Sequence, residues 1–270
     1  MAFDDYEMSV ESSNAAELYE FSYQGGTLRY TSADHPITFD SHIYPPVAIQ
    51  HTPVKEVADI AKASLTITAP PDFPVAELFR VAPPDDVVGL VVRRLQIDDG
   101  TAEAFWLGRV LSSRWPPDQC ELRCESIYTS MRMPGLRRIY SKNCPHVLYG
   151  LKCAVVEASF QQSITVSGVS GRTITSPDFE AFADTYFAGG KLRWESTPGY
   201  FVRRGIKIHD GDTVVVSHPI PGLAPGTLLI ALPGCNHTLQ HCDEKFSNTL
   251  NYGGFPYMTE RNPFGANSVF

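Results

Sequence analysis

Four of the six cysteines in this chain have a spacing that suits a metal centre. Cys144 and Cys153 are separated by eight residues, and Cys235 and Cys242 by six. Each pair brackets a short segment with loop or single-turn character. Two such pairs can present four thiolates to one centre, and soft sulfur ligands favour zinc, copper(I) or iron–sulfur centres.

The spacing bears on the type of centre. Zinc modules usually pair ligands across about two to four residues. An iron–sulfur cluster is larger than a single ion and accepts ligands from more widely separated loops, so the spacing favours a cluster. Zinc stays an alternative, because His237 and His241 lie four apart and could join Cys235 or Cys242 in a Cys/His site. The four thiols could also bind no metal at all, with ordinary polar histidines nearby, or form a disulfide within each pair after oxidation.

The stretch that follows Cys242 suits the surroundings of such a centre. Asn248 and Asn251 have side chains that fix turns. Gly253 and Gly254 let the backbone approach another group closely or adopt a positive φ. Around a metal, residues of this kind donate hydrogen bonds to sulfur and set the loop. The alternative is an ordinary turn before a tail.

The remaining two cysteines have a different pattern. Cys120, Leu122 and Cys124 fall two apart, on one face of an alternating segment. We therefore expect Cys120 and Cys124 to be small buried core residues.

The elements that must position these residues are mainly strands. Pro and Gly number 21 and 20 of 270 residues, and the Pro share exceeds the usual ~5%. Apolar runs typical of strands alternate with turn residues. The expected strands are 17–23, 28–31, 37–39, 43–44, 64–68, 87–97, 105–111, 119–127, 192–194, 200–202, 207–216 and 228–232.

Two helices are expected. Residues 74–81 form a short one. A second begins at Ser176, with Pro177 in its first turn, and ends at Gly189-Gly190. Its aromatic residues recur at helical spacing and predict a core-facing stripe.

A composition shift near residue 130 predicts a domain boundary. Residues 131–138 are apolar and arginine-rich, which suits either a solvated connector or an interface strip. We expect a β-rich N-terminal domain at 1–135 and a C-terminal domain at 136–270. The predicted fold class is mainly β with an α+β C-terminal part.

Charge and hydropathy narrow the possible functions. Lys and Arg number 22 and Asp and Glu 30, a net charge of −8. Tight nucleic-acid binding needs a basic stripe, so we expect no specific nucleic-acid binding. No apolar run reaches about 18 residues, so no membrane span is expected. The first residues lack a secretory signal pattern. We therefore expect synthesis and assembly in a reducing cytoplasm, where cysteines are thiols or metal ligands.

The sequence resembles the tail-tip and baseplate hub proteins of long-tailed phages and gene transfer agents, and is similar in role to the L protein of the phage lambda tail tip. The resemblance covers nearly the whole chain. Its most specific parts are the Cys-Pro-His segment and the stretch after Cys242. The matching segments are residues 18–21, 29–34, 106–110, 124–127, 143–150, 234–235, 242–248 and 251–256.

The resemblance implies an N-terminal β-barrel-like hub domain and a smaller C-terminal domain that holds an iron–sulfur cluster, most simply [4Fe-4S]. The implied ligands are Cys144, Cys153, Cys235 and Cys242. Residues expected to support them are His146, Asn248, Asn251 and Gly253. One departure is that Lys152 and Ala154 flank Cys153, where the family has a glycine-flanked setting.

The resemblance also implies a non-enzymatic virion protein, a minor tail protein at the tail tip. It would form a homotrimer ring that closes the tail tube. Its partners would be the distal tail protein, the tube end, the tape measure protein and the central fibre or receptor-binding protein, with DNA passing nearby. It would be assembled in the bacterial host cytoplasm.

Two further functions stay open. One is a redox or metal-dependent enzyme that acts when the host cell is penetrated, although four thiolates would saturate a centre. The sequence also has no Gly-rich phosphate loop, His-Glu-x-x-His or Gly-x-Ser-x-Gly motif. The second is a host-receptor-binding module, for which residues 252–264 are the candidate loop.

Overall fold

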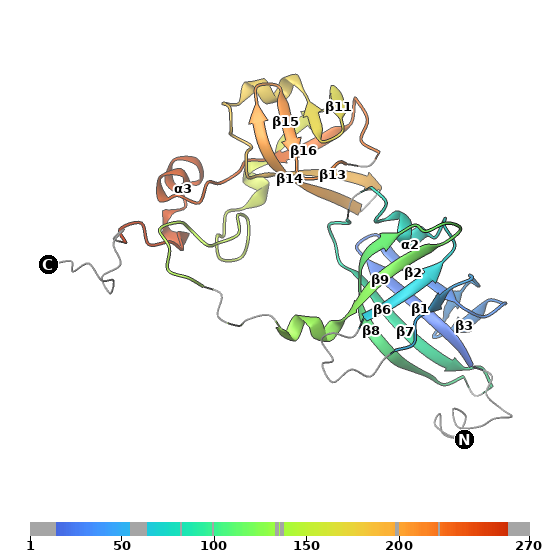
Figure 1. Ribbon diagram of the computed structural model, residues 1–270. Helices are drawn as coiled ribbons and strands as arrows, with labels where there is room; N and C mark the ends of the chain where they lie inside the picture. Colours follow the sequence, from blue (N-terminus) through green and yellow to red (C-terminus); the bar gives the residue numbers. More distant parts are fainter. Residues whose placement is uncertain are drawn as a thin grey trace. The chain divides into compact units, whose positions relative to one another are not determined.

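The computed structural model describes residues 15–54, 64–81, 83–98, 100–132, 135, 138–197, 200–220 and 222–258. The chain divides into two compact units, Met1–Met133 and Pro134–Phe270, which we call unit 1 and unit 2. Strands dominate both units (Figure 1). The prediction of a mainly β chain is therefore confirmed. The predicted boundary after residue 135 falls beside residues 133–134 and 136–137, which lie outside the described ranges.

Unit 1 is built on a seven-stranded antiparallel sheet with the order β2-β1-β7-β8-β9-β6-β5. The sheet curls, because the segment that leads to β5 runs beside β2. There the Thr31 amide donates to Pro45 O over 3.0 Å, and the Val47 amide to Thr31 O over 3.0 Å. The strands are β1 (Ala15–Tyr23), β2 (Gly26–Thr31), β5 (Gln50–His51), β6 (Ser64–Ala69), β7 (Val88–Gln96), β8 (Ala102–Arg114) and β9 (Cys120–Ser126).

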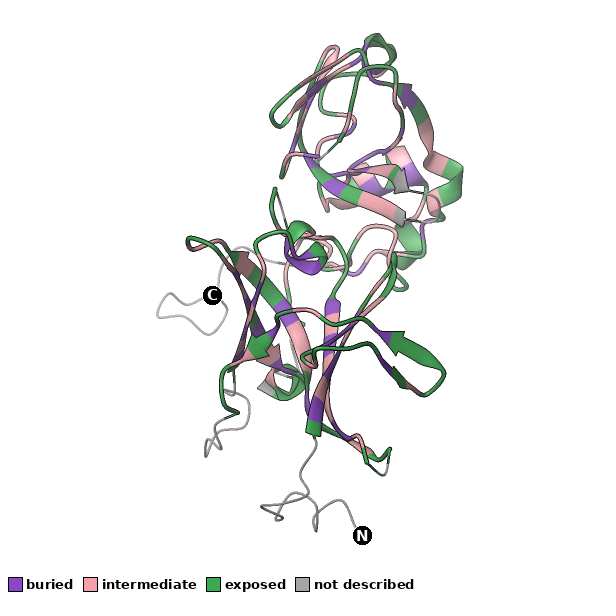
Figure 2. Ribbon diagram, turned by 90° about the vertical axis from the view of Figure 1, so that its right-hand side faces the viewer, coloured by how far each residue is buried: buried purple, intermediate pink, exposed green. Residues whose placement is uncertain are grey.

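Apolar side chains at alternate positions along the strands fill the inside of the curled sheet. Tyr19 and Phe21 of β1 are fully buried in the main core of unit 1. Cys120 and Cys124 of β9 are also fully buried there, as their spacing predicted. Burial raises the pKa of both thiols, so they stay neutral packing residues. Figure 2 shows buried residues interspersed with exposed and half-buried ones along the strands.

Smaller elements complete unit 1. The predicted helix at 74–81 is the single turn α2 (Pro74–Glu77), which inserts Val75 into the core. A separate hairpin joins β3 (Ile37–Phe39) to β4 (His42–Tyr44) and covers the other face of β1 in a second, smaller core. A 3-10 helix, η2 (Ile127–Arg132), follows β9.

Unit 2 carries a second seven-stranded antiparallel sheet, with the order β10-β16-β13-β14-β15-β12-β11. Its outermost strands, β10 and β11, are consecutive in the chain with only Val166 and Ser167 between them. The sheet therefore curls round on itself about its own apolar core. The strands are β10 (Gln162–Thr165), β11 (Gly168–Ser170), β12 (Thr173–Thr175), β13 (Lys191–Thr197), β14 (Tyr200–Asp210), β15 (Thr213–Val216) and β16 (Leu228–Leu232).

The helix predicted from Ser176 to Gly190 was wrong. Ser176 does cap a turn with its side chain, but that turn is the short 3-10 helix η4 (Pro177–Ala181). Phe182 is extended, and Thr185 has a left-handed φ of 67°. The rings of Phe182 and Phe187 pack edge to face, with centroids 4.9 Å apart. The aromatic residues spaced three or four apart therefore pack together in a short irregular segment and not along one face of a helix.

The rest of unit 2 is a region of loops and short helices, residues 138–160 and 233–258, which we call the cysteine lobe. Its helices are η3 (Glu157–Phe160), α3 (Leu239–Phe246) and η5 (Thr249–Asn251). The α+β character of the C-terminal half rests on α3, which has eight residues. Among the described residues, no helix is long and apolar enough to cross a membrane.

Candidate metal centre

Each of the four candidate cysteines lies in a tightly defined loop or helix turn. Cys235 follows the end of β16, and Cys242 lies in α3. Helix α3 begins at a cap formed by Thr238, whose hydroxyl accepts a hydrogen bond from the His241 amide. Cys153 lies in a turn in which the Ala154 amide donates to Gly150 O over 2.8 Å.

The four thiols line a single pocket in the cysteine lobe. All six cysteines of the chain are free thiols. Around the pocket, the structure brings together segments that are about 90 residues apart in sequence. The pocket is lined by Cys144, His146, Leu148, Cys153, Val155, Cys235, His237, Thr238, Cys242, Phe246, Asn248, Asn251 and Tyr252.

Three of the four sulfur atoms accept N–H hydrogen bonds. The Gly253 amide donates to Cys144 Sγ and the His237 amide to Cys235 Sγ, each over 3.3 Å. Asn248 Nδ2 lies 3.8 Å from Cys153 Sγ. Donors of this kind stabilise the negative charge of a thiolate and orient it as a ligand.

The same loops hold each other in place. The Cys144 amide donates to His237 O over 2.9 Å. The Tyr252 hydroxyl donates to Lys142 O over 2.6 Å, and His237 O lies 3.1 Å from the same hydroxyl oxygen. Asn248 Nδ2 donates to Cys153 O over 2.6 Å. These bonds connect both cysteine pairs to the stretch after α3.

The predicted supporting residues all lie at this site. His146 Nδ1 faces Asn251 O at 3.1 Å, and Asn251 Nδ2 donates to Asn248 Oδ1 over 2.7 Å. A side chain on Gly253 would meet the His146 ring at 2.5 Å. Gly253 therefore lets its amide reach Cys144 Sγ while the His146 ring packs over it.

Electrostatics disfavour the ionised forms of Cys235 and Cys242 in the absence of a cation. Burial raises the pKa of Cys235, and the nearby Cys153 and Cys144 raise it further. Burial also raises the pKa of Cys242, as do Cys235, Cys153 and Cys144. Four thiolates in this pocket would repel one another, so a bound cation is the natural way to ionise them together.

Sequence reasoning missed Lys245. Its ammonium group donates to Tyr186 O and to Gly234 O, the latter over 2.9 Å, and lies 4.0 Å from the Tyr186 ring centroid. Burial lowers the pKa of Lys245 to about 8. Lys245 thus ties α3, which carries Cys242, to the residue before Cys235. A lysine in the last turn of a short helix gives no sequence signal for this role.

Of the two histidines of the alternative zinc site, His237 lines the pocket and His241 does not. His237 has a left-handed φ of 64°. His241 Nε2 faces Gly234 O at 3.4 Å, and its ring lies against Phe246. The structure therefore brings His237, rather than His241, to the four thiols.

The donor chemistry suits a metal, but the thiols are not arranged for one. In the described part of the chain, no three His, Cys, Asp or Glu groups form a ready metal-ion site. The free volume among the side chains is about 10 Å³, room for about one water molecule. Four thiols that line one pocket, three of them with N–H donors, are nevertheless the ligand type of a thiolate-bound centre. A multi-iron cluster would require the loops to move outward more than a single ion would.

We expect Asn248→Ala to weaken metal binding without unfolding the sheet of unit 2. The change removes the side-chain donor to Cys153 O and Sγ. Loss of such a supporting contact typically lowers metal affinity about 10–100-fold. Chelator competition, followed by metal analysis, measures the metal affinity of each variant. Gln240→Ala, on the exposed side of α3, is the control. Equal affinities for the two variants would contradict the role of Asn248.

Comparison with solved structures finds a match over the whole chain. In a solved structure described as the virion of a native gene transfer agent (GTA) particle, a similar chain aligns with a TM-score of 0.75 and 17% identity. The alignment covers 100% of this chain and 99% of that chain. At this identity the likeness shows a shared fold. Among curated proteins, none matches the chain.

A family model matches part of the chain. The family is described as "Phage conserved hypothetical protein BR0599", and the match spans residues 185–262. The matched segment includes Cys235, Cys242, Asn248 and Gly253. The first cysteine pair lies before it.

Proposed function

We propose that this chain is a structural protein of a phage or GTA virion. The observation that carries the proposal is the end-to-end agreement of its fold with a chain of a GTA particle. The match of residues 185–262 to a phage family supports it independently. Within the virion, we place the chain at the tail tip as a baseplate hub. There it closes the distal end of the tail tube and links it to the central fibre or receptor-binding protein.

The proposal includes an iron–sulfur centre, most simply [4Fe-4S], on Cys144, Cys153, Cys235 and Cys242, with zinc as the alternative. The pocket lined by these four thiols supports it. None of the apolar core clusters among the described residues includes a residue of the cysteine lobe. A bound centre would cross-link the loops, and its binding free energy would become folding free energy of the lobe.

The surface of the lobe supports a role in assembly. Leu151, Leu250 and Tyr257 are almost fully exposed, at 102%, 99% and 92%. Large apolar side chains in such positions suit a protein that neighbours cover in a particle. The proposed neighbours are two further copies in a homotrimer ring, the distal tail protein, the end of the tail tube and the tape measure protein.

The proposed role is not enzymatic. The net charge of −8 suits a ring through which DNA passes without adhering, because like charges repel. The N-terminal part of the host-binding candidate, residues 252–258, is held against the metal pocket by Tyr252, Gly253 and Phe255. Residues 259–264 lie outside the described ranges.

Labelling of purified particles tests the assignment. A peptide tag at the N-terminus, detected by antibody in electron micrographs, should appear at the distal end of the tail. Quantitative mass spectrometry should find the chain at a few copies per particle. Label on the head, or particles that lack the chain, would contradict the proposal.

A further inference from the structure

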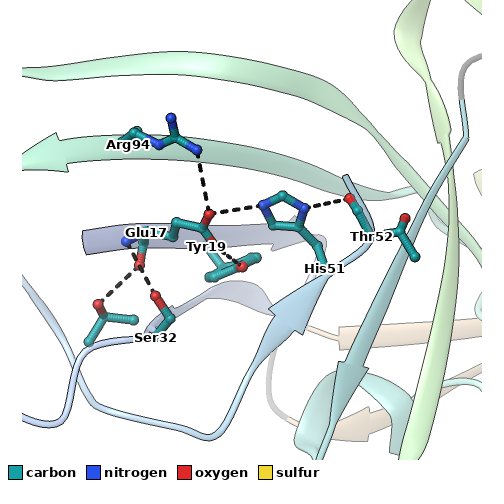
Figure 3. A network of polar contacts seen from close by, with 7 residues as sticks. Glu17, Tyr19, Ser32, His51, Thr52 and Arg94 are labelled. Carbon is teal, nitrogen blue, oxygen red and sulfur yellow. Dashed lines mark hydrogen bonds and ion pairs between the residues drawn. The ribbon is translucent and has the colours of Figure 1, made fainter. Parts of the chain in front are cut away.

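A histidine in unit 1 connects strands that are not neighbours in the sheet. His51 lies in β5, whose sheet partner is β6, whereas Glu17 lies in β1, between β2 and β7. His51 Nε2 nevertheless lies 3.1 Å from Glu17 Oε1 (Figure 3). This side-chain contact joins the edge strand β5 to β1, the second strand from the opposite edge, between residues 34 apart in sequence.

The two contacts of the His51 ring nitrogens favour one protonation state. Its second ring nitrogen, Nδ1, lies 2.7 Å from Thr52 O. A backbone carbonyl and an ionised carboxylate only accept hydrogen bonds, so both ring nitrogens must carry a proton to make both contacts. The arrangement therefore fits the imidazolium form of His51.

The groups around His51 come from three strands. From β1, Tyr19 donates its hydroxyl to Glu17 Oε2 over 2.5 Å. From β7, Arg94 Nη2 lies 3.9 Å from Glu17 Oε1. From β8, the Phe105 ring packs 5.4 Å from the His51 ring. The His51 side chain is only 9% exposed, so water competes weakly for its bonds.

We propose that His51 and Glu17 form a proton-dependent latch that closes the sheet of unit 1. With both groups charged, the latch fastens the segment around β5 to β1. Loss of the His51 proton leaves a lone pair facing either the carboxylate or the Thr52 carbonyl. One of the two contacts then opens, and the edge of the sheet loosens.

The pKa shifts agree with this latch. The hydrogen bond to Glu17 raises the pKa of His51, although burial and Arg94 oppose it. Burial acts to raise the pKa of Glu17, but bonds from His51 and Tyr19 outweigh it and lower the pKa. The His51 contribution to stability is therefore complete below its unfolded pKa of about 6.5 and is lost as pH rises through the folded pKa. The Glu17 contribution is present above its unfolded pKa and is lost as pH falls through the folded one.

Histidine titration by NMR on the full chain tests the latch directly. The ring of His51 should titrate above the ordinary pKa of about 6.5. In the Glu17→Gln variant it should titrate at a lower pH than in the wild type. His35 is a built-in control, because its partner Asp34 is 95% exposed and Glu17→Gln should leave its titration unchanged. A His51 that titrates at or below the ordinary value would overturn the proposal.

Amide hydrogen exchange measures how readily the sheet of unit 1 opens at its β5 edge. The Thr52 amide donates to Thr66 O over 2.9 Å. Above the His51 pKa, its exchange should accelerate beyond the intrinsic rise with pH, by up to about tenfold for each pH unit. In a His51→Gln variant this extra acceleration should vanish, whereas a His35→Gln variant should keep it. If the exchange rate of the Thr52 amide has the same pH dependence in the wild type and in His51→Gln, the proposed latch is wrong.

Discussion

Replacement of Cys235 by serine is expected to unfold the cysteine lobe and leave both β sheets folded. In structural zinc-finger sites the metal contributes about 10–16 kcal/mol to folding, as much as or more than the ~5–15 kcal/mol stability of a typical domain. The lobe contributes no residue to the apolar core clusters of the described chain, so apart from the centre it depends on hydrogen bonds between its loops and on the anchor at Lys245. Loss of one thiolate should therefore expose residues 138–160 and 233–258 to limited proteolysis and hydrogen exchange.

The matched control is Cys124→Ala. Cys124 is fully buried in the core of unit 1, so its loss should weaken that unit and leave the metal content unchanged. If the lobe of Cys235→Ser keeps wild-type protection and metal content, the centre is not what holds the lobe together.

The second large effect is expected from Gly234→Ala, next to Cys235. A Cβ at this position would stand 1.7 Å from Ala188 O and 2.6 Å from Gly190 N. These are backbone atoms, so no side-chain rotation relieves the clash. Overpacking costs about 1–3 kcal/mol and occasionally more, and we expect the upper end, about 3 kcal/mol. Calorimetry should show the transition of unit 2 lowered by roughly 10 °C, with reduced metal binding because the Cys235 loop is displaced.

Gly205→Ala in β14 is the control for this change. A Cβ there meets only Ser217 Oγ, at an ordinary 3.9 Å. Its transition should stay close to that of the wild type. Equal stability of the Gly234 and Gly205 variants would show that residues 188–190 and the segment before Cys235 are not packed as tightly as the structure has them.

Much of the β structure could be predicted because it depends on local signals. The turn Gln24-Gly25 joins β1 to β2, and the turn Gly211-Asp212 joins β14 to β15; both lie at the glycines that mark them in the sequence. The period of two at Cys120 and Cys124 correctly marked a buried strand face. The helix predicted after Ser176 failed because aromatic spacing alone does not distinguish a helix face from a folded aromatic cluster.

Long-range features could not be predicted from such signals. Curling of each sheet depends on contacts such as Thr31 with Pro45, which no local pattern encodes. The contact of His51 with Glu17 is of the same kind. At the site, the residue types and spacing indicated Cys144, Asn248 and Gly253. The anchoring of α3 by Lys245 depends on a long-range arrangement that brings Tyr186 and Gly234 to the same lysine.

Metal analysis of the anaerobically purified full chain tests the central claim most directly. With an iron–sulfur centre on the four cysteines, the protein should be brown, with a broad visible absorption band and about four iron and four sulfide per chain. That absorption should disappear in the Cys144→Ser variant and persist in Cys120→Ala. A colourless wild-type protein that carries one zinc per chain would reassign the centre. A metal-free protein with an ordered lobe would contradict the account.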